Sequence, residues 1–114
     1  MKKVKIFIVE DESIIALNLK ETLIELGYEP CGIAPNRDKA ISLLENGVEP
    51  DLILMDIHLK GQTTGIELAQ ELKETLPTTP IIFVTANSEL DIIKKASESF
   101  VYGYILKPYQ KNHL

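Results

Sequence analysis

Residues 50–56 of this chain read Pro-Asp-Leu-Ile-Leu-Met-Asp. An apolar run of this length, bounded by an aspartate on each side, is too short for a typical helix and fits a strand buried on both faces. Strands of that kind belong to parallel sheets that helices cover on both sides. The aspartate that ends the run, Asp56, would therefore lie at the carboxyl edge of a parallel sheet.

The same pattern repeats along the chain, which has 114 residues. The apolar runs predict strands at 4–9, 31–34, 52–55, 81–84 and 102–106. Between them, apolar residues recur at helical spacing. These are Ile15, Leu19, Leu23 and Leu26 in the first helix, Ala40, Leu43 and Leu44 in the second, Ile66, Ala69, Leu72 and Leu76 in the third, and Leu90, Ile93 and Ala96 in the fourth.

The expected helix ends carry capping and stop signals. Asn36 is a suitable N-cap for the second helix, Gly27 and Gly47 follow the first and second helices, and Pro77 follows the third. Residues 88–91, Ser-Glu-Leu-Asp, are typical of a capping box. Regular alternation of strands and helices predicts an α/β fold, a flavodoxin-like doubly wound sheet of five parallel strands in the order 2-1-3-4-5.

Composition narrows the functional classes. The chain is 45% hydrophobic and 25% charged, which is typical of one globular domain over residues 1–114. Its net charge of −5 argues against nucleic-acid binding by this domain. Cys31 is the only cysteine, so we interpret it as a small core residue. No segment has the pattern of a signal peptide or membrane span, so we expect a cytoplasmic location without membrane contact.

Polar residues follow four of the five expected strands. They are Glu10, Asp11 and Glu12 after the first, Asp56 after the third, Thr85 after the fourth and Lys107 after the fifth. In this sheet order, ligands bind beyond the carboxyl ends of strands 1 and 3. Clustered carboxylates repel one another, and oxygen ligands suit Mg²⁺. A carboxylate beside a metal ion and a lysine is typical of phosphoryl transfer, with Asp56 as the nucleophile.

Each residue also has a purely structural interpretation. Asp11 could be the N-cap of the first helix, and Glu10 and Glu12 could be solvated acids of its first turn. Asp56 could cap a loop, Thr85 could be an ordinary strand residue, and Lys107 could be a surface lysine. Their joint occurrence at four strand ends favours a functional site.

Four segments closely resemble the signatures of response regulator receiver domains. They are Ile-Phe-Ile-Val-Glu-Asp-Glu at 6–12, Pro-Asp-Leu-Ile-Leu-Met-Asp at 50–56, Phe-Val-Thr-Ala at 83–86 and Gly-Tyr-Ile-Leu-Lys-Pro at 103–108. The resemblance extends from Val4 to about Tyr109. It implies a two-component signalling switch, phosphorylated by a sensor histidine kinase or a phosphotransfer protein. Such a domain is no enzyme beyond catalysing its own phosphorylation and dephosphorylation.

By this resemblance, Asp56 is the phosphoacceptor. Mg²⁺ would be bound by Asp11, Asp56 and the backbone carbonyl of His58, with Glu10 helping through water. Lys107 would pair first with Asp56 and then with the phosphoryl group, and its bond to the following proline would be cis.

The resemblance also implies a switch. Thr85 and Tyr104 would be the switch pair, altering a surface of helix 4, strand 5 and helix 5 around residues 90–109. The final helix is either truncated or continues beyond Leu114, and the resemblance allows an output domain after it. It also allows a phosphorylation-dependent homodimer. The sequence departs from the family after the acceptor, where the loop is longer and Thr64 replaces a common aspartate.

Three other functions fit less well. An aspartate-dependent phosphatase would have a second aspartate where this chain has His58. A flavin-binding domain would need a phosphate-binding loop where residues 10–12 are acidic. A degenerate receiver acting only through protein contacts is not indicated, because the expected acceptor, metal ligands, Thr85 and Lys107 are all present.

Overall fold

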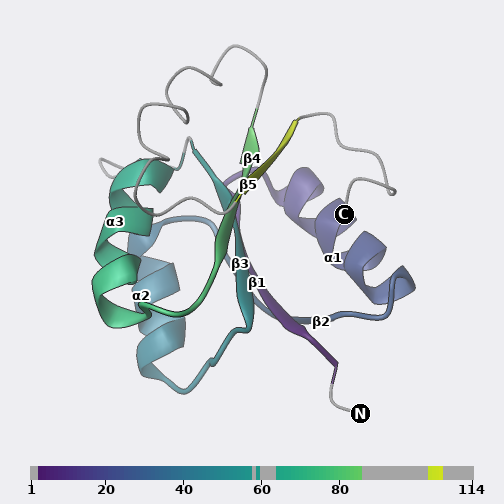
Figure 1. The fold of residues 1–114 in the computed structure, drawn as a ribbon. Coiled ribbons are helices and arrows are strands. Elements are labelled where there is room, and N and C mark those ends of the chain that lie inside the picture. The colour runs from purple at the N-terminus through teal and green to yellow at the C-terminus, as the bar shows by residue number, and fades with distance from the viewer. Residues whose placement is uncertain (1–2, 58, 60–63, 86–102, 107–114) are drawn as a thin grey trace.

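One parallel sheet organises the protein (Figure 1). The computed structural model describes residues 3–57, 59, 64–85 and 103–106. Their five strands are β1 (Lys5–Val9), β2 (Glu29–Ala34), β3 (Leu52–Asp56), β4 (Ile81–Thr85) and β5 (Gly103–Leu106). All neighbouring strands are parallel, in the order β2-β1-β3-β4-β5. The predicted α/β fold and strand order are therefore confirmed.

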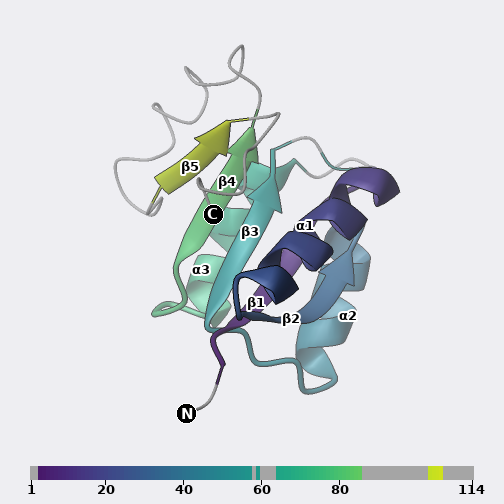
Figure 2. The same ribbon diagram turned by 90° about the vertical axis from the view of Figure 1, so that its right-hand side faces the viewer.

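Helices cover both faces of the sheet. Figures 1 and 2 show α1 (Ser13–Glu25) on one face and α2 (Arg37–Glu45) and α3 (Gly65–Thr75) on the other. None of the helices that the structure describes is long and apolar enough to cross a membrane. The predicted fourth helix, with its capping box at 88–91, lies outside the described residues.

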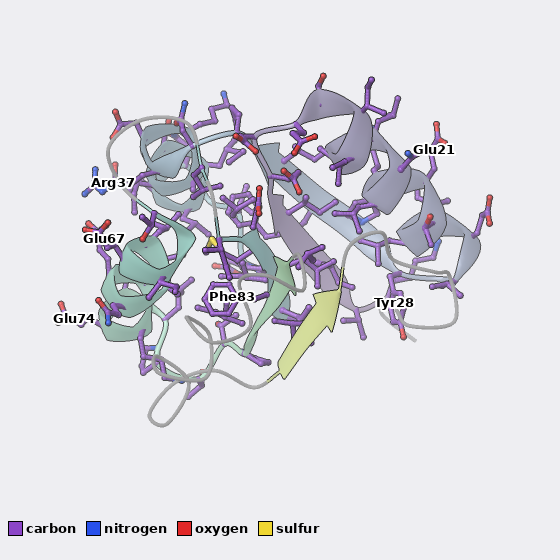
Figure 3. The ribbon with its side chains drawn as sticks, turned by 90° about the horizontal axis from the view of Figure 1, so that it is seen from above. Glu21, Tyr28, Arg37, Glu67, Glu74 and Phe83 are labelled. Atoms are coloured by element: carbon purple, nitrogen blue, oxygen red, sulfur yellow. The ribbon has the colours of Figure 1, made fainter. Side chains whose placement is uncertain are left out.

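Two apolar clusters separate the sheet from these helices. Because side chains alternate along a strand, Phe7 and Val9 of β1 contribute to the cluster beneath α2 and α3, whereas Ile6 and Ile8 contribute to the cluster beneath α1. Phe83 of β4 is fully buried on the side of α3 (Figure 3). Burial on both faces explains why the strand segments are almost continuously apolar.

The apolar stripes of the helices, that is, the apolar residues that recur at helical spacing, differ in detail from the prediction. In α1, Ala16 is buried beside Leu19 and Leu23, and the sequence analysis missed it. Leu26 was expected in the same stripe, but it is the C-cap of α1 and 37% exposed. The prediction was therefore wrong for Leu26, the last residue of the stripe, because the helix ends before it. In α3, the prediction missed Leu68, which is fully buried.

The helix boundaries follow from local hydrogen bonds. The side chain of Asn36 accepts a hydrogen bond from the backbone N–H of Lys39 at 2.9 Å, which confirms the predicted N-cap of α2. Gly27 and Gly47 have φ of 92° and 103°, the left-handed conformation that ends a helix.

A capping box that the sequence analysis did not identify opens α3. The hydroxyl of Thr64 accepts a hydrogen bond from the backbone N–H of Glu67, and the carboxylate of Glu67 accepts one from the backbone N–H of Thr64, each at 3.1 Å. Both bonds satisfy donors that the start of a helix leaves without intrahelical partners. Thr64 thus fixes the residue at which α3 begins.

An ion pair joins α2 to α3. Arg37 of α2 donates two hydrogen bonds to Glu71 of α3, from Nε to Oε2 at 2.8 Å and from Nη2 to Oε1 at 2.5 Å. These bonds lower the pKa of Glu71 and raise the pKa of Arg37. Figure 3 shows Arg37 at the side of the molecule where the two helices lie.

Candidate functional site

The candidate site lies where β1 and β3 end. These strands are hydrogen-bonded neighbours, and Val9 is paired with Met55. Glu10 and Asp11 follow β1 directly, and Asp56 is the last residue of β3. Parallel pairing therefore places all three acidic residues at the same edge of the sheet. This is also the point at which the strand order reverses, because β2 lies on one side of β1 and β3 on the other.

The three carboxylates converge on a small volume. One carboxylate oxygen from each of Glu10, Asp11 and Asp56 lies within 4.8 Å of the other two. Glu10 is 2% exposed and Asp56 4%, whereas Asp11 is only partly buried. The structure thus brings together three of the predicted metal ligands. Asp11 supplies the side that water can reach.

A backbone hydrogen bond orients the first of these carboxylates. The N–H of Glu12 donates to Oε2 of Glu10 at 3.2 Å, while Oε1 of Glu10 is buried. The N–H of Glu10 donates to the carbonyl of Ala34 at 2.9 Å, which continues the pairing of β1 with β2. Glu10 is therefore held by its backbone and its side chain.

Hard divalent cations fit this donor set. Grouping negative charges in a largely buried position is unfavourable unless a cation or hydrogen bonds compensate for the lost hydration. Mg²⁺ prefers oxygen ligands and usually keeps several waters. The three carboxylates provide the oxygen ligands, and the partly exposed Asp11 leaves room for the waters. The site can consequently hold a cation against the carboxylate of Asp56.

The structural interpretations of the first two acids are wrong. The N-cap of α1 is Glu12 rather than Asp11, and the side chain of Glu12 makes no capping hydrogen bond. Glu10 is buried instead of solvated, and the first turn of α1 contains no acidic residue. Because α1 begins at Ser13, all three acids precede the helix, and Glu10 and Asp11 remain available to the site.

The remaining predicted site residues are placed only in part. Thr85 ends β4 and directly follows Val84, which is paired with Asp56. Tyr104 lies in β5, paired with Phe83. The side chains of Thr85 and Tyr104 are not among those described. The two other expected participants, the carbonyl of residue 58 and the lysine at 107, lie outside the described residues, as does the predicted cis bond between 107 and 108.

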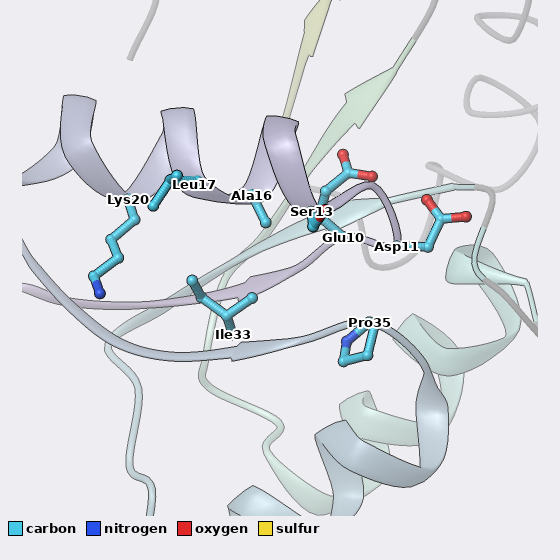
Figure 4. A pocket seen from close by; sticks show the side chains of 8 residues that line it. All are labelled: Glu10, Asp11, Ser13, Ala16, Leu17, Lys20, Ile33 and Pro35. Carbon is cyan, nitrogen blue, oxygen red and sulfur yellow. The ribbon is translucent and has the colours of Figure 1, made fainter.

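An open groove of about 430 Å³ extends from the acidic residues between α1 and β2 (Figure 4). Glu10 and Asp11 lie at one end of it and Lys20 at the other, with mainly apolar side chains between them. Beside the groove, Leu17 of α1 is 52% exposed, and Ile14 in the first turn is 76% exposed. The sequence analysis missed this surface. Its signal was a second set of apolar residues in α1, outside the buried stripe.

Comparison with known proteins gives one consistent result. The family model described as "Response regulator receiver domain" matches residues 6–114. The transcriptional regulatory protein PdtaR of Mycobacterium tuberculosis is 34% identical over 110 residues, which are 96% of this chain and 52% of PdtaR. The chemotaxis protein CheY of Pseudomonas aeruginosa is 33% identical over 107 residues, 92% of this chain and 85% of CheY.

A solved structure agrees with these sequence matches. The signal receiver domain of a modulated diguanylate cyclase from Desulfovibrio desulfuricans G20 has a TM-score of 0.84 at 31% identity, over 97% of this chain and 86% of that one. The chain spans about half the length of PdtaR, 52%, and 45% of the transcriptional regulatory protein MalR of Bacillus subtilis.

Proposed function

This chain belongs to the response regulator receiver domain family, and on that premise we propose that Asp56 accepts a phosphoryl group and thereby switches the domain between two states. The observation that carries the proposal is the convergence of Glu10, Asp11 and Asp56 at the carboxyl edge of the sheet. Asp56 ends the central strand β3, so its backbone is fixed by pairing with β1 on one side and β4 on the other.

The cation of this site is Mg²⁺. Asp11 and Asp56 would bind it directly, and Glu10 would act through a bound water, with the carbonyl of His58 as a further ligand. When bound, the metal supplies positive charge that offsets the negative charge of the incoming phosphoryl oxygens. The hydrogen bond from Glu12 keeps Glu10 oriented towards the site before any cation arrives.

The reaction is a phosphoryl transfer to a carboxylate. A carboxylate oxygen of Asp56 forms a bond to phosphorus as the bond from phosphorus to the donor breaks, and the electron pair of that bond leaves with the donor. The donor is the phosphohistidine of a partner protein, which leaves as imidazole, or an acyl phosphate, which leaves as a carboxylate. Lys107 contributes positive charge facing the transferred group. The domain catalyses only this reaction and the hydrolysis that reverses its effect.

The product is sensed through the neighbouring strands. Thr85 is one residue beyond the backbone partner of Asp56, which supports its role as the group that binds a phosphoryl oxygen. Tyr104 would then change its position and alter the surface of helix 4, strand 5 and helix 5. The two states need differ by only a few kcal/mol for phosphorylation to select one of them.

A sensor histidine kinase or phosphotransfer protein is the proposed donor. Any protein donor must approach Asp56 over the edge of the sheet where α1 begins, and there Ile14 and Leu17 expose apolar surface beside the groove. Exposed apolar side chains clustered near a reactive group favour contact with a protein partner.

The relatives support the output domain and the cellular location that we propose. An output domain beyond Leu114 is supported by relatives twice as long as this chain, several of which are named as transcriptional regulators. A third and longer relative, NtrC of Proteus hauseri, is named as a DNA-binding transcriptional regulator, and DNA lies in the bacterial cytoplasm, where we place this domain. A phosphorylation-dependent homodimer is a further state that we propose for the activated domain.

Acetyl phosphate treatment followed by intact-mass measurement tests this function. We expect one added phosphoryl group in the presence of Mg²⁺ and none after chelation. Asp56→Asn should abolish the addition, whereas Asp51→Asn, which changes the aspartate at the opposite end of β3, should retain it. Equal labelling of Asp56→Asn and the unmodified chain would mean that another residue is the acceptor.

A further inference from the structure

Gly65, the first residue of α3, lies against the backbone of the acceptor. A Cβ atom built on Gly65 would lie 1.9 Å from the carbonyl oxygen of Asp56 and 2.8 Å from both the carbonyl carbon of Asp56 and the Cα of Ile57. Carbon and oxygen atoms normally approach no closer than about 3.3 Å. Any side chain at this position would therefore require the two backbone segments to separate by more than about 1 Å.

The glycine is needed for space and not for an unusual dihedral angle. The described glycines with positive φ are Gly27 and Gly47, and a Cβ on either would meet nothing within 4 Å. At Gly32 the nearest atoms belong to the ring of Phe7, at 3.0 Å, and a side chain can move aside. Of the glycines whose surroundings are described, Gly65 alone would meet backbone, which has less freedom to move.

Several contacts hold Gly65 in this position. Its N–H donates a hydrogen bond to the carbonyl of Ile57 at 2.6 Å. The capping box of Thr64 and Glu67 fixes the first turn of α3, and the fully buried Leu68 anchors that turn in the apolar cluster. The start of α3 and the end of β3 are consequently packed together as one unit.

We propose that Gly65 is a positioning residue for phosphoryl transfer, because its lack of a side chain lets α3 seat the Asp56–Ile57 backbone where the Asp56 carboxylate meets Glu10 and Asp11. The inference rests on the proposed function, since it assumes that those carboxylates bind Mg²⁺. The carbonyl that Gly65 contacts and the carboxylate that reacts are attached to the same Cα of Asp56. Moving the carbonyl therefore displaces the carboxylate.

The expected effects follow from the size of that displacement. Misplacing a reacting group by about 1 Å can slow a reaction by roughly 100-fold. Loss of the groups that support metal ligands commonly weakens metal binding by roughly 10–100-fold. Gly65→Ala should therefore raise the dissociation constant for Mg²⁺ and slow phosphorylation by acetyl phosphate, each within these ranges.

The test compares Gly65→Ala with two controls. Gly47→Ala adds the same methyl group far from the site, at a glycine whose positive φ makes the substitution unfavourable. Leu72→Ala removes a buried side chain from the same helix and should cost about 2–5 kcal/mol of stability. For all variants, Mg²⁺ is titrated while backbone amide shifts near Asp11 are followed by NMR. Stability is measured by urea denaturation, and trimethylamine N-oxide is added at one concentration throughout to favour the folded state.

Weakened Mg²⁺ binding by folded Gly65→Ala, with unchanged binding by both controls, would support the positioning role. Unchanged binding by Gly65→Ala would overturn it, as would equal weakening in Leu72→Ala, because the effect would then follow stability alone. A Gly65→Ala chain that remains unfolded in the osmolyte would also overturn the proposal, since the glycine would then serve the fold as a whole. If the unmodified chain itself bound no Mg²⁺, the proposed function would fail instead.

Discussion

Replacing Asp56 by asparagine should make the metal-free domain more stable. The substitution preserves the shape of a side chain that is 4% exposed and removes one of three neighbouring charges. At 4.8 Å and an effective dielectric constant of about 20, two unit charges repel by about 3.5 kcal/mol. Asp56 has two such neighbours, but Asp11 is partly solvated, each charge is spread over two oxygens, and the expected pairing of Asp56 with Lys107 offsets part of the repulsion. We therefore expect a net gain of about 1–3 kcal/mol in the free energy of unfolding.

Magnesium should narrow this difference in stability between the two proteins. At a concentration of about ten times the dissociation constant, a ligand that binds only the folded state stabilises it by about 1.4 kcal/mol. The unmodified chain should gain this amount, whereas Asp56→Asn, with one ligand lost, should gain much less. The assay is urea denaturation followed by far-UV circular dichroism, with and without MgCl₂. A change of 1–3 kcal/mol shifts the midpoint by roughly 1 M urea in a domain of this size.

Glu12→Gln is the matched control. It removes the same charge from a residue close in sequence to Glu10 and Asp11, but Glu12 is exposed and lies outside the cluster. Its effect should stay within about 0.5 kcal/mol, with the full gain from Mg²⁺ retained. Two results would refute the reasoning: an Asp56→Asn protein that is less stable than the unmodified chain without metal, or one that gains as much from Mg²⁺.

Three further predictions concern residues outside the site. Asn36→Ala removes the side-chain hydrogen bond to the N–H of Lys39 and should lower the free energy of unfolding by about 1 kcal/mol, measured by urea denaturation; no change would mean that the N-cap is dispensable. Because Arg37 lowers the pKa of Glu71 in the folded state, their pairing stabilises the protein at neutral pH and is lost as pH falls through that lowered pKa. Glu71→Gln should therefore lose less stability than the unmodified chain between neutral pH and about pH 3, and equal losses would contradict the assignment. Burial raises the pKa of the Cys31 thiol, so iodoacetamide should alkylate it more slowly in the folded protein than in urea at the same pH, as followed by intact mass.

Sequence patterns predicted most of the sheet because burial on both faces leaves a nearly continuous apolar run. The same reasoning located Glu10, Asp11 and Asp56, since parallel strands bring their carboxyl ends to one edge. Strand order and helix direction made this convergence predictable without any side-chain detail. The sequence did not define the last residue of α1, and for that reason Leu26 was wrongly assigned to the buried residues of this helix.

Two features of the site depend on tertiary packing and could not be predicted from local patterns. A glycine at the start of an amphipathic helix has many uses, and only the close approach of α3 to β3 identifies what Gly65 does. Likewise, the burial of Glu10 conflicts with the usual exposure of glutamate, and it follows from the pairing of its backbone with Ala34 of β2. Thr64 carried a readable capping signal together with Glu67, which the sequence analysis did not use.

Identifying the phosphorylated residue tests the central claim most directly. The domain is treated with acetyl phosphate and Mg²⁺, and borohydride then reduces the acyl phosphate, so that the modified aspartate becomes homoserine. Peptide mass spectrometry locates that residue. The account predicts homoserine at position 56 alone, and none when Mg²⁺ is chelated. Homoserine at Asp11 or Asp51, or its absence from every peptide, would contradict the account.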